Sequence, residues 1–162
     1  MKTQQELSRG FKSAPAPENT RAIPGAVFNF LARGNETNGR HALIRISVQQ
    51  GAEPPAHTHS REDESYYVLE GSVRYNIGED EITVHAGEYV YLPKDLPHSF
   101  KILTAKAELL MWISPAGLDT WFWDNSVPAP DGNPLPQLQG PPPPELIQHF
   151  VTSLQTYGVE MI

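Results

Sequence analysis

The chain has 162 residues, about the length of one domain, with 39% apolar and 19% charged residues, a balance that is ordinary for a folded protein and excludes wholesale disorder. The net charge is −7 and no two Lys or Arg residues are adjacent, so the electrostatic footprint of a nucleic-acid-binding protein is missing. The absence of cysteine excludes disulfides, thiolate nucleophiles and cysteine-based zinc sites.

Residues 1–21 are polar, contain two prolines, and are expected to form an N-terminal arm ahead of the folded domain. This stretch lacks the apolar centre of a signal peptide, and no apolar run in the sequence approaches the length of a membrane span. We therefore expect a cytoplasmic protein with no membrane partner.

Residues 22–115 contain short apolar runs separated by turn residues at nearly regular intervals. Ile44, Ile46 and Val48 alternate with Leu43, Arg45 and Ser47, as in a strand with one buried face. Many short strands with brief connections predict an antiparallel sandwich or a small barrel. The predicted strands are 27–32, 41–48, 65–70, 72–77, 81–85, 88–93, 98–103 and 108–114.

Residues 116–162 differ in composition and are predicted to be a C-terminal extension. Half of the 16 prolines lie between positions 128 and 144, which predicts an extended strap along the surface. Residues 145–158 carry apolar side chains at helical spacing, and this helix is expected to pack on the outside of the barrel. The aromatic segment 121–123 could anchor a helix to the barrel or form part of a lid.

Two histidines and three acidic residues are crowded into residues 57–64, HTHSREDE. On a strand, His57 and His59 point to the same face because side chains alternate, and His98 opens a later predicted strand. Three imidazoles and one of these carboxylates make a ligand set for a divalent transition metal and leave open positions for a substrate. The remaining histidines are expected to be surface or hydrogen-bonded residues: His41, His85 and His149.

The segment GAEPPAHTHSREDESYYVLEG, residues 51–71, resembles the first motif of the cupin superfamily. The resemblance implies that Glu64 is the carboxylate ligand. Glu62 and Asp63 are then left in a loop, either solvated or orienting a ligand histidine.

The segment GEYVYLPKDLPHSFKI resembles the second cupin motif, with Gly87, Pro93 and His98 in place. It departs from the family pattern at Asp95, where the family prefers Gly, and at Ile102, where it prefers Asn. Neither position is a metal ligand in the family, so these departures do not put the site in doubt.

The resemblance implies an all-β fold: a cupin-type double-stranded β-helix, or conical jelly-roll barrel, with a C-terminal helix. The PAG after the last predicted strand and the YGVEM near the C-terminus add a similarity to small single-domain, quercetinase-like cupins. Such proteins hold one divalent transition metal per chain, with iron as the leading candidate and Mn, Ni, Co, Cu or Zn as alternatives. They commonly form homodimers, and a homodimer is expected here.

The leading hypothesis for function is a metal-dependent dioxygenase that acts on an aromatic or enolisable small molecule such as a flavonol. Glu64 would be both a ligand and the base that accepts the substrate's proton. The sequence has no cluster of Arg and Lys near the histidines that could bind a phosphorylated sugar. Two alternatives remain: a metal-dependent isomerase, epimerase or lyase, and a non-catalytic small-molecule-binding protein. The residues expected to line the substrate pocket are Ile44, Ile46, Tyr66, Val68, Phe100 and Met111.

Overall fold

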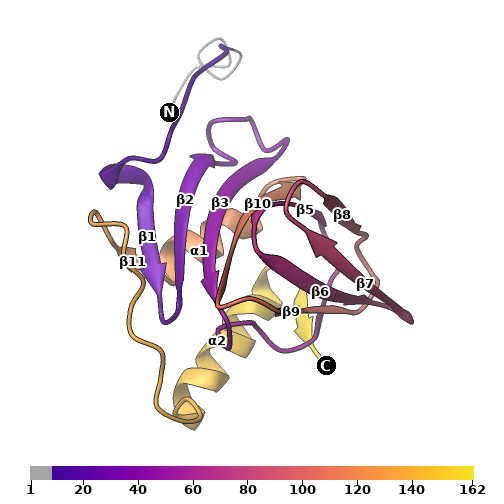
Figure 1. Ribbon diagram of the computed structural model, residues 1–162. Helices are drawn as coiled ribbons and strands as arrows, with labels where there is room; N and C mark the ends of the chain where they lie inside the picture. The colour runs from indigo at the N-terminus through magenta and orange to yellow at the C-terminus, as the bar shows by residue number, and fades with distance from the viewer. Residues whose placement is uncertain (1–8) are drawn as a thin grey trace.

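Two antiparallel β-sheets form the body of the protein (Figure 1). The structure is a computed structural model and describes residues 9–162. A 3-10 turn at Pro17–Asn19 leads into the strands. These are β1 (Thr20–Ile23), β2 (Ala26–Ala32), β3 (Ala42–Gln49), β4 (His57–His59), β5 (Asp63–Glu70), β6 (Ser72–Ile77), β7 (Asp80–His85), β8 (Tyr89–Leu92), β9 (His98–Ile102), β10 (Lys106–Ser114), β11 (Val127–Pro128) and β12 (Val159–Met161); the helices are α1 (Leu118–Asp124) and α2 (Pro144–Thr156).

The strand order shows how distant parts of the sequence meet. The larger sheet has the order β11-β1-β2-β3-β10-β5-β8, and the smaller one has the order β12-β4-β9-β6-β7. Consecutive strands such as β4 and β5 therefore lie in different sheets, as in a jelly roll. The predicted all-β fold with a C-terminal helix is confirmed.

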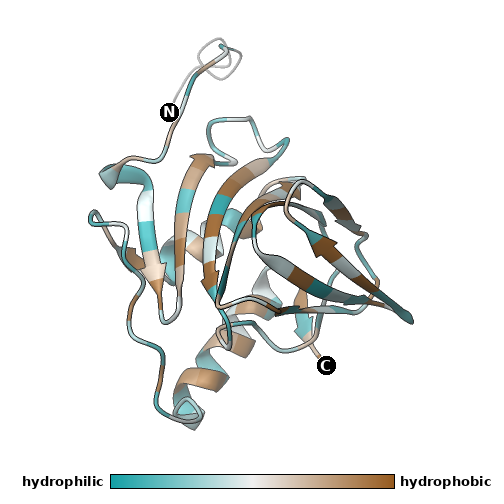
Figure 2. Ribbon diagram, in the orientation of Figure 1, coloured by the Kyte–Doolittle hydropathy of each residue, from teal (hydrophilic) through white to brown (hydrophobic). Residues whose placement is uncertain are grey.

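The core lies between the inner faces of the two sheets. In β3, buried Ile44, Ile46 and Val48 alternate with partly exposed residues, as the sequence predicted. On β10 and β6, Met111 and Tyr75 are at most 1% exposed, so both sheets supply the same core. Brown and teal segments alternate along several strands in Figure 2, which is the pattern of sheets with one face buried.

The turn between β5 and β6 requires a glycine. Gly71 has φ of 88°, and a Cβ atom there would lie 2.6 Å from Oγ1 of Thr104 and 2.7 Å from the carbonyl oxygen of Lys106. Any larger residue would combine backbone strain with steric overlap. This turn carries the chain from one sheet to the other directly after the strand that bears Glu64.

The segments outside the predicted barrel also contribute strands. β1 begins at Thr20, inside the region that the sequence assigned to the arm, and pairs with both β2 and β11. Residues 1–8 of that predicted arm lie outside the described residues. Within residues 9–162, neither helix is long and apolar enough to cross a membrane.

Candidate metal centre

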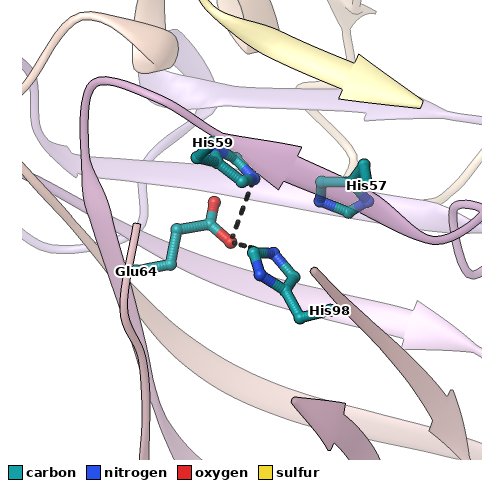
Figure 3. Close-up of side chains that lie close together, drawn as sticks. All are labelled: His57, His59, Glu64 and His98. Atoms are coloured by element: carbon teal, nitrogen blue, oxygen red, sulfur yellow. Dashed lines mark ion pairs between the residues drawn. The ribbon is translucent and has the colours of Figure 1, made fainter. Parts of the chain in front are cut away.

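Four side chains from three strands meet inside the barrel. His57 and His59 lie on β4, Glu64 lies on β5, and His98 is the first residue of β9, where it pairs with His57. One possible ligand atom from each residue lies within 4.8 Å of the others, and all four residues are buried. Figure 3 shows the three imidazoles and the carboxylate pointing toward one another. The structure thus brings together all four predicted metal ligands.

Two histidine nitrogens that face the centre of this cluster have no hydrogen-bond partner among the described residues. Nε2 of His59 and Nε2 of His98 lie 3.7 and 3.6 Å from Oε2 of Glu64, beyond hydrogen-bonding distance. Both nitrogens are buried and have no hydrogen-bond partner among the described residues. Buried polar atoms are nearly always satisfied, and a transition metal bound by the four ligands would satisfy these. The donor set therefore fits such an ion.

The opposite nitrogen of each imidazole is held by the protein. Nδ1 of His57 donates to the carbonyl oxygen of Pro55 at 2.7 Å, and Nδ1 of His98 donates to that of Leu96 at 3.2 Å. Nδ1 of His59 lies 2.6 Å from Oε1 of Glu62. Such bonds fix the ring orientation and leave Nε2 free to coordinate. Glu62 therefore contacts a ligand histidine, one of the two roles that the sequence left open for it.

The loop before His98 explains one departure from the family motif. Asp95 has φ of 63°, a left-handed conformation that glycine adopts most easily and aspartate tolerates better than most residues. Its backbone N–H donates to the carbonyl oxygen of His59 at 2.7 Å. The loop thus ties the residues before one ligand to the backbone of another.

The buried charges of the site depend on one another. Burial alone would raise the pKa of Glu64, but the imidazoles of His98, His59 and His57 lower it to about 2. Burial lowers the pKa of His57. For His59, burial also acts to lower the pKa, but the hydrogen bond to Glu62 and the charge of Glu64 outweigh it and raise the value. A carboxylate that stays charged among imidazoles suits a cation site.

A largely apolar cavity of about 640 Å³ opens from the cluster. Tyr66 lines it, and its hydroxyl donates to Oε2 of Glu64 at 3.2 Å. Burial, and then the charge of Glu64, raise the pKa of Tyr66, so it remains a hydrogen-bond donor. The other predicted pocket residues that line the cavity are Ile46, Phe100 and Met111. Ile44 and Val68 were also expected there but lie in the core, fully buried, and are not part of the cavity wall.

The C-terminal extension supplies much of the cavity wall, and the contribution of α2 to it was not expected from the sequence. Helix α2 was expected to pack its apolar face on the outside of the barrel; the structure places four of its apolar side chains in the cavity wall, and β12, which follows the helix, pairs with β4. The lining residues of α2 are Ile147, Phe150, Val151 and Leu154. The apolar spacing of this helix predicted that one of its faces would be buried. Nothing in the sequence indicated which surface that face would cover.

The aromatic segment 121–123 contacts both the cavity and the barrel. Trp121 and Phe122 line the cavity. Trp123 instead packs edge-on against Phe30 and lies under the guanidinium group of Arg33, 4.1 Å from the ring centre. Helix α1 is thus anchored by one side of this segment and contributes to the cavity with the other.

The remaining histidines lie outside the cluster. His41 is partly exposed, and His85 and His149 are exposed. The ring of His85 contacts the hydroxyl of Ser72 at 2.9 Å. None of the three belongs to the metal-ligand group found among the described residues.

Comparison with known proteins relates one segment of the chain to a family and identifies the fold. Residues 44–114 match the family model described as a cupin domain. The two antiparallel sheets and the structural neighbours that are cupins show that the chain has a cupin fold, and the matched segment covers less than half of the chain.

The similar proteins are distant. An uncharacterized protein of Methanocaldococcus jannaschii is 27% identical to this chain over 78 residues. The matched region covers 48% of this chain and 62% of the relative, which is less than two thirds of the relative's length. An RmlC-like cupin from Shewanella frigidimarina has a TM-score of 0.58 and 22% identity over 68% of this chain and 96% of its own. Pac13, a nucleoside dehydratase from Streptomyces, has a TM-score of 0.55 and 16% identity, over 69% of this chain and 88% of its own. Identities this low establish the fold alone.

Proposed function

We propose that the protein is a metal-dependent enzyme in which His57, His59, Glu64 and His98 bind one divalent transition metal, with iron as the leading candidate. One observation carries this proposal: four buried donors converge, and the two Nε2 atoms nearest to Glu64 have no other partner among the described residues. A site with three histidines and one carboxylate leaves coordination positions open, which suits catalysis better than a purely structural role.

The reaction that we favour is dioxygenation of an aromatic or enolisable small molecule, and flavonols are one example of such a substrate. A bound metal would supply the open positions at which a deprotonated substrate oxygen and dioxygen can meet. The cavity wall supports an apolar substrate because aromatic and aliphatic side chains dominate it. Tyr66 would hold the carboxylate of Glu64 in place through its hydrogen bond.

The proposed second role of Glu64, as the base, receives less support. Its pKa of about 2 keeps the carboxylate charged, as a ligand must be, but makes it a weak base near neutral pH. The geometry therefore supports the ligand role, and a substrate that binds as a preformed anion would need no base.

A second candidate is a lyase or isomerase that uses the metal only as a Lewis acid. The observation that favours it is the buried Tyr66–Glu64 pair, in which a donor and an acceptor lie 3.2 Å apart beside the histidines. The hydroxyl of Tyr66 could also hydrogen-bond a substrate oxygen at the metal site, a role that needs no oxidant. The fold similarity to a nucleoside dehydratase is compatible with this candidate.

The deciding experiment measures metal content and oxygen uptake together. The protein is purified without a chelating column, its metals are quantified, and flavonols and other enolisable phenols are screened with an oxygen electrode. We expect stoichiometric metal that is lost in His57→Ala but kept in His85→Ala, the matched control for an exposed histidine. Turnover that is equal with and without oxygen would refute the dioxygenase and favour the lyase or isomerase. Metal without any turnover would favour a binding protein.

A further inference from the structure

The cavity beside the candidate metal site has one polar end and a long apolar wall. The polar end consists of His57, His59, Glu64 and the hydroxyl of Tyr66. The rest of the wall comes largely from parts of the chain that follow the barrel, namely α1, the proline-rich strap and α2. Its principal apolar side chains are Trp121, Phe122, Leu138, Ile147, Phe150 and Val151.

Most polar groups along that wall are already used within the protein. Both carboxylate oxygens of Glu53 accept backbone N–H groups, from Gly51 at 2.8 Å and from Ile102 at 2.7 Å. The hydroxyl of Ser126 donates to the carbonyl oxygen of Phe122 at 2.6 Å. These groups hold the loops in place and are not available to a ligand.

The two amide side chains in the wall are engaged through their nitrogen atoms. The amide nitrogen of Asn125 donates to the carbonyl oxygen of Trp121, and that of Gln137 donates to Gln49 and to the backbone of Gln50. Among residues 9–162, no lysine or arginine lines the cavity. A ligand with polar or charged groups along its body would therefore bury them without adequate partners, which opposes binding.

We infer that the cavity binds a ligand whose polar atoms are confined to one end: a monoanionic, metal-chelating head group on an otherwise apolar chain or ring system. A divalent ion and the carboxylate of Glu64, its one charged ligand, together carry a charge of +1. A single anionic head group neutralises that charge. Residues of α1 and α2, outside the segment that matches the cupin domain, select the apolar body.

This inference rests on the metal site of the proposed function and narrows its substrate class. Heavily hydroxylated flavonols become poor candidates, since their outlying hydroxyls would face the apolar wall. Enolisable compounds with an unsubstituted hydrocarbon body become the better candidates.

A homologous series of alkyl hydroxamates tests the inference, because every member has the same chelating head and only the tail grows. Cobalt(II)-loaded protein is titrated without oxygen with acetohydroxamate, butanohydroxamate, hexanohydroxamate and octanohydroxamate. The visible bands of cobalt report binding of the head, and calorimetry gives the affinity. Each methylene that is buried should tighten binding about fourfold, until the cavity is filled.

A matched pair of variants on α2 tests which residues form the apolar wall. Ile147 lines the cavity but is 45% exposed, so Ile147→Glu is compatible with folding. The neighbouring Gln148 is exposed and does not line this cavity, and Gln148→Glu makes the same change in charge. Ile147→Glu should weaken octanohydroxamate about tenfold or more and leave acetohydroxamate unchanged, whereas Gln148→Glu should bind both probes normally.

The outcomes separate this inference from the proposed function. An affinity that does not rise with chain length, measured while the cobalt bands still respond to the head, would overturn the inference and leave the metal site standing. Protein that fails to hold cobalt would overturn both. A rise with chain length in the absence of any oxygen-dependent turnover would support the inference and count against the dioxygenase.

Discussion

The bond between Glu62 and His59 gives a sharp prediction about metal binding. Glu62→Gln should weaken binding of a divalent metal about tenfold, and Glu62→Ala about a hundredfold. Glutamine keeps an oxygen that can accept the Nδ1–H of His59 but loses the negative charge, whereas alanine removes the acceptor. The graded loss follows from that difference.

The expected size comes from the geometry of the contact. Oε1 of Glu62 lies 2.6 Å from Nδ1 of His59, and the two side chains are only 3% and 2% exposed, so solvent does not screen the interaction. A hydrogen bond to a charged group contributes about 1.5–3 kcal/mol net. Each factor of ten in affinity corresponds to about 1.4 kcal/mol, which places the loss between about tenfold and a hundredfold.

The assay is a competition titration of zinc or cobalt between the protein and a chromophoric chelator. Asp63→Asn is the matched control, because it removes the adjacent negative charge from a carboxylate that accepts the backbone N–H of Lys94 at 2.8 Å and contacts no ligand histidine. Far-UV circular dichroism of each variant verifies that it is folded. Glu62 variants that bind metal as tightly as the unchanged protein would refute the orienting role.

Three further predictions concern other buried groups. His57→Ala should abolish the metal-induced rise in melting temperature, a stabilisation of about 2.7 kcal/mol when free metal is a hundred times Kd; a rise that persists in differential scanning fluorimetry would contradict the ligand set. Asp119→Ala should cost about 3 kcal/mol in urea denaturation, because its carboxylate accepts the N–H groups of Gly34 and Gly117, both at 2.9 Å; Asp119→Asn should cost less, and equal losses would argue against these bonds. Tyr75→Phe should be neutral or stabilise by about 1 kcal/mol, since this buried hydroxyl has no partner among the described residues; a clear loss of stability would show that the hydroxyl is bonded.

The strands with local apolar alternation were predictable from the sequence. β6 has the predicted bounds, 72–77, and β3 differs from its predicted range by one residue at each end. β12 was missed because Val159–Met161 is short and carries no repeating pattern. Its strand conformation comes from pairing with β4, a tertiary contact.

The metal ligands were predictable because the motif fixes their spacing, but the shape of the cavity was not. The apolar spacing of α2 indicated a buried stripe, yet the partner of that stripe depends on how residues 128–161 cross the barrel. The burial of Ile44 and Val68 below the cavity, rather than in its wall, likewise depends on the depth of packing between the sheets. The homodimer and the cytoplasmic location stay predictions.

The pairing of β12 with β4 bears on when the protein can acquire its metal. β4 has three residues and pairs with β9 only at His57. β12 pairs with all three residues of β4, and His59 lies opposite Val159, which is 100 positions away in the sequence. Closing so long a loop is an entropically costly, late step of folding. During synthesis, His57 and His59 therefore leave the ribosome well before β12, the strand that pairs with them. A metal ion at this site would then be bound after translation has passed residue 161, from the metals that the surrounding compartment offers to the folded barrel.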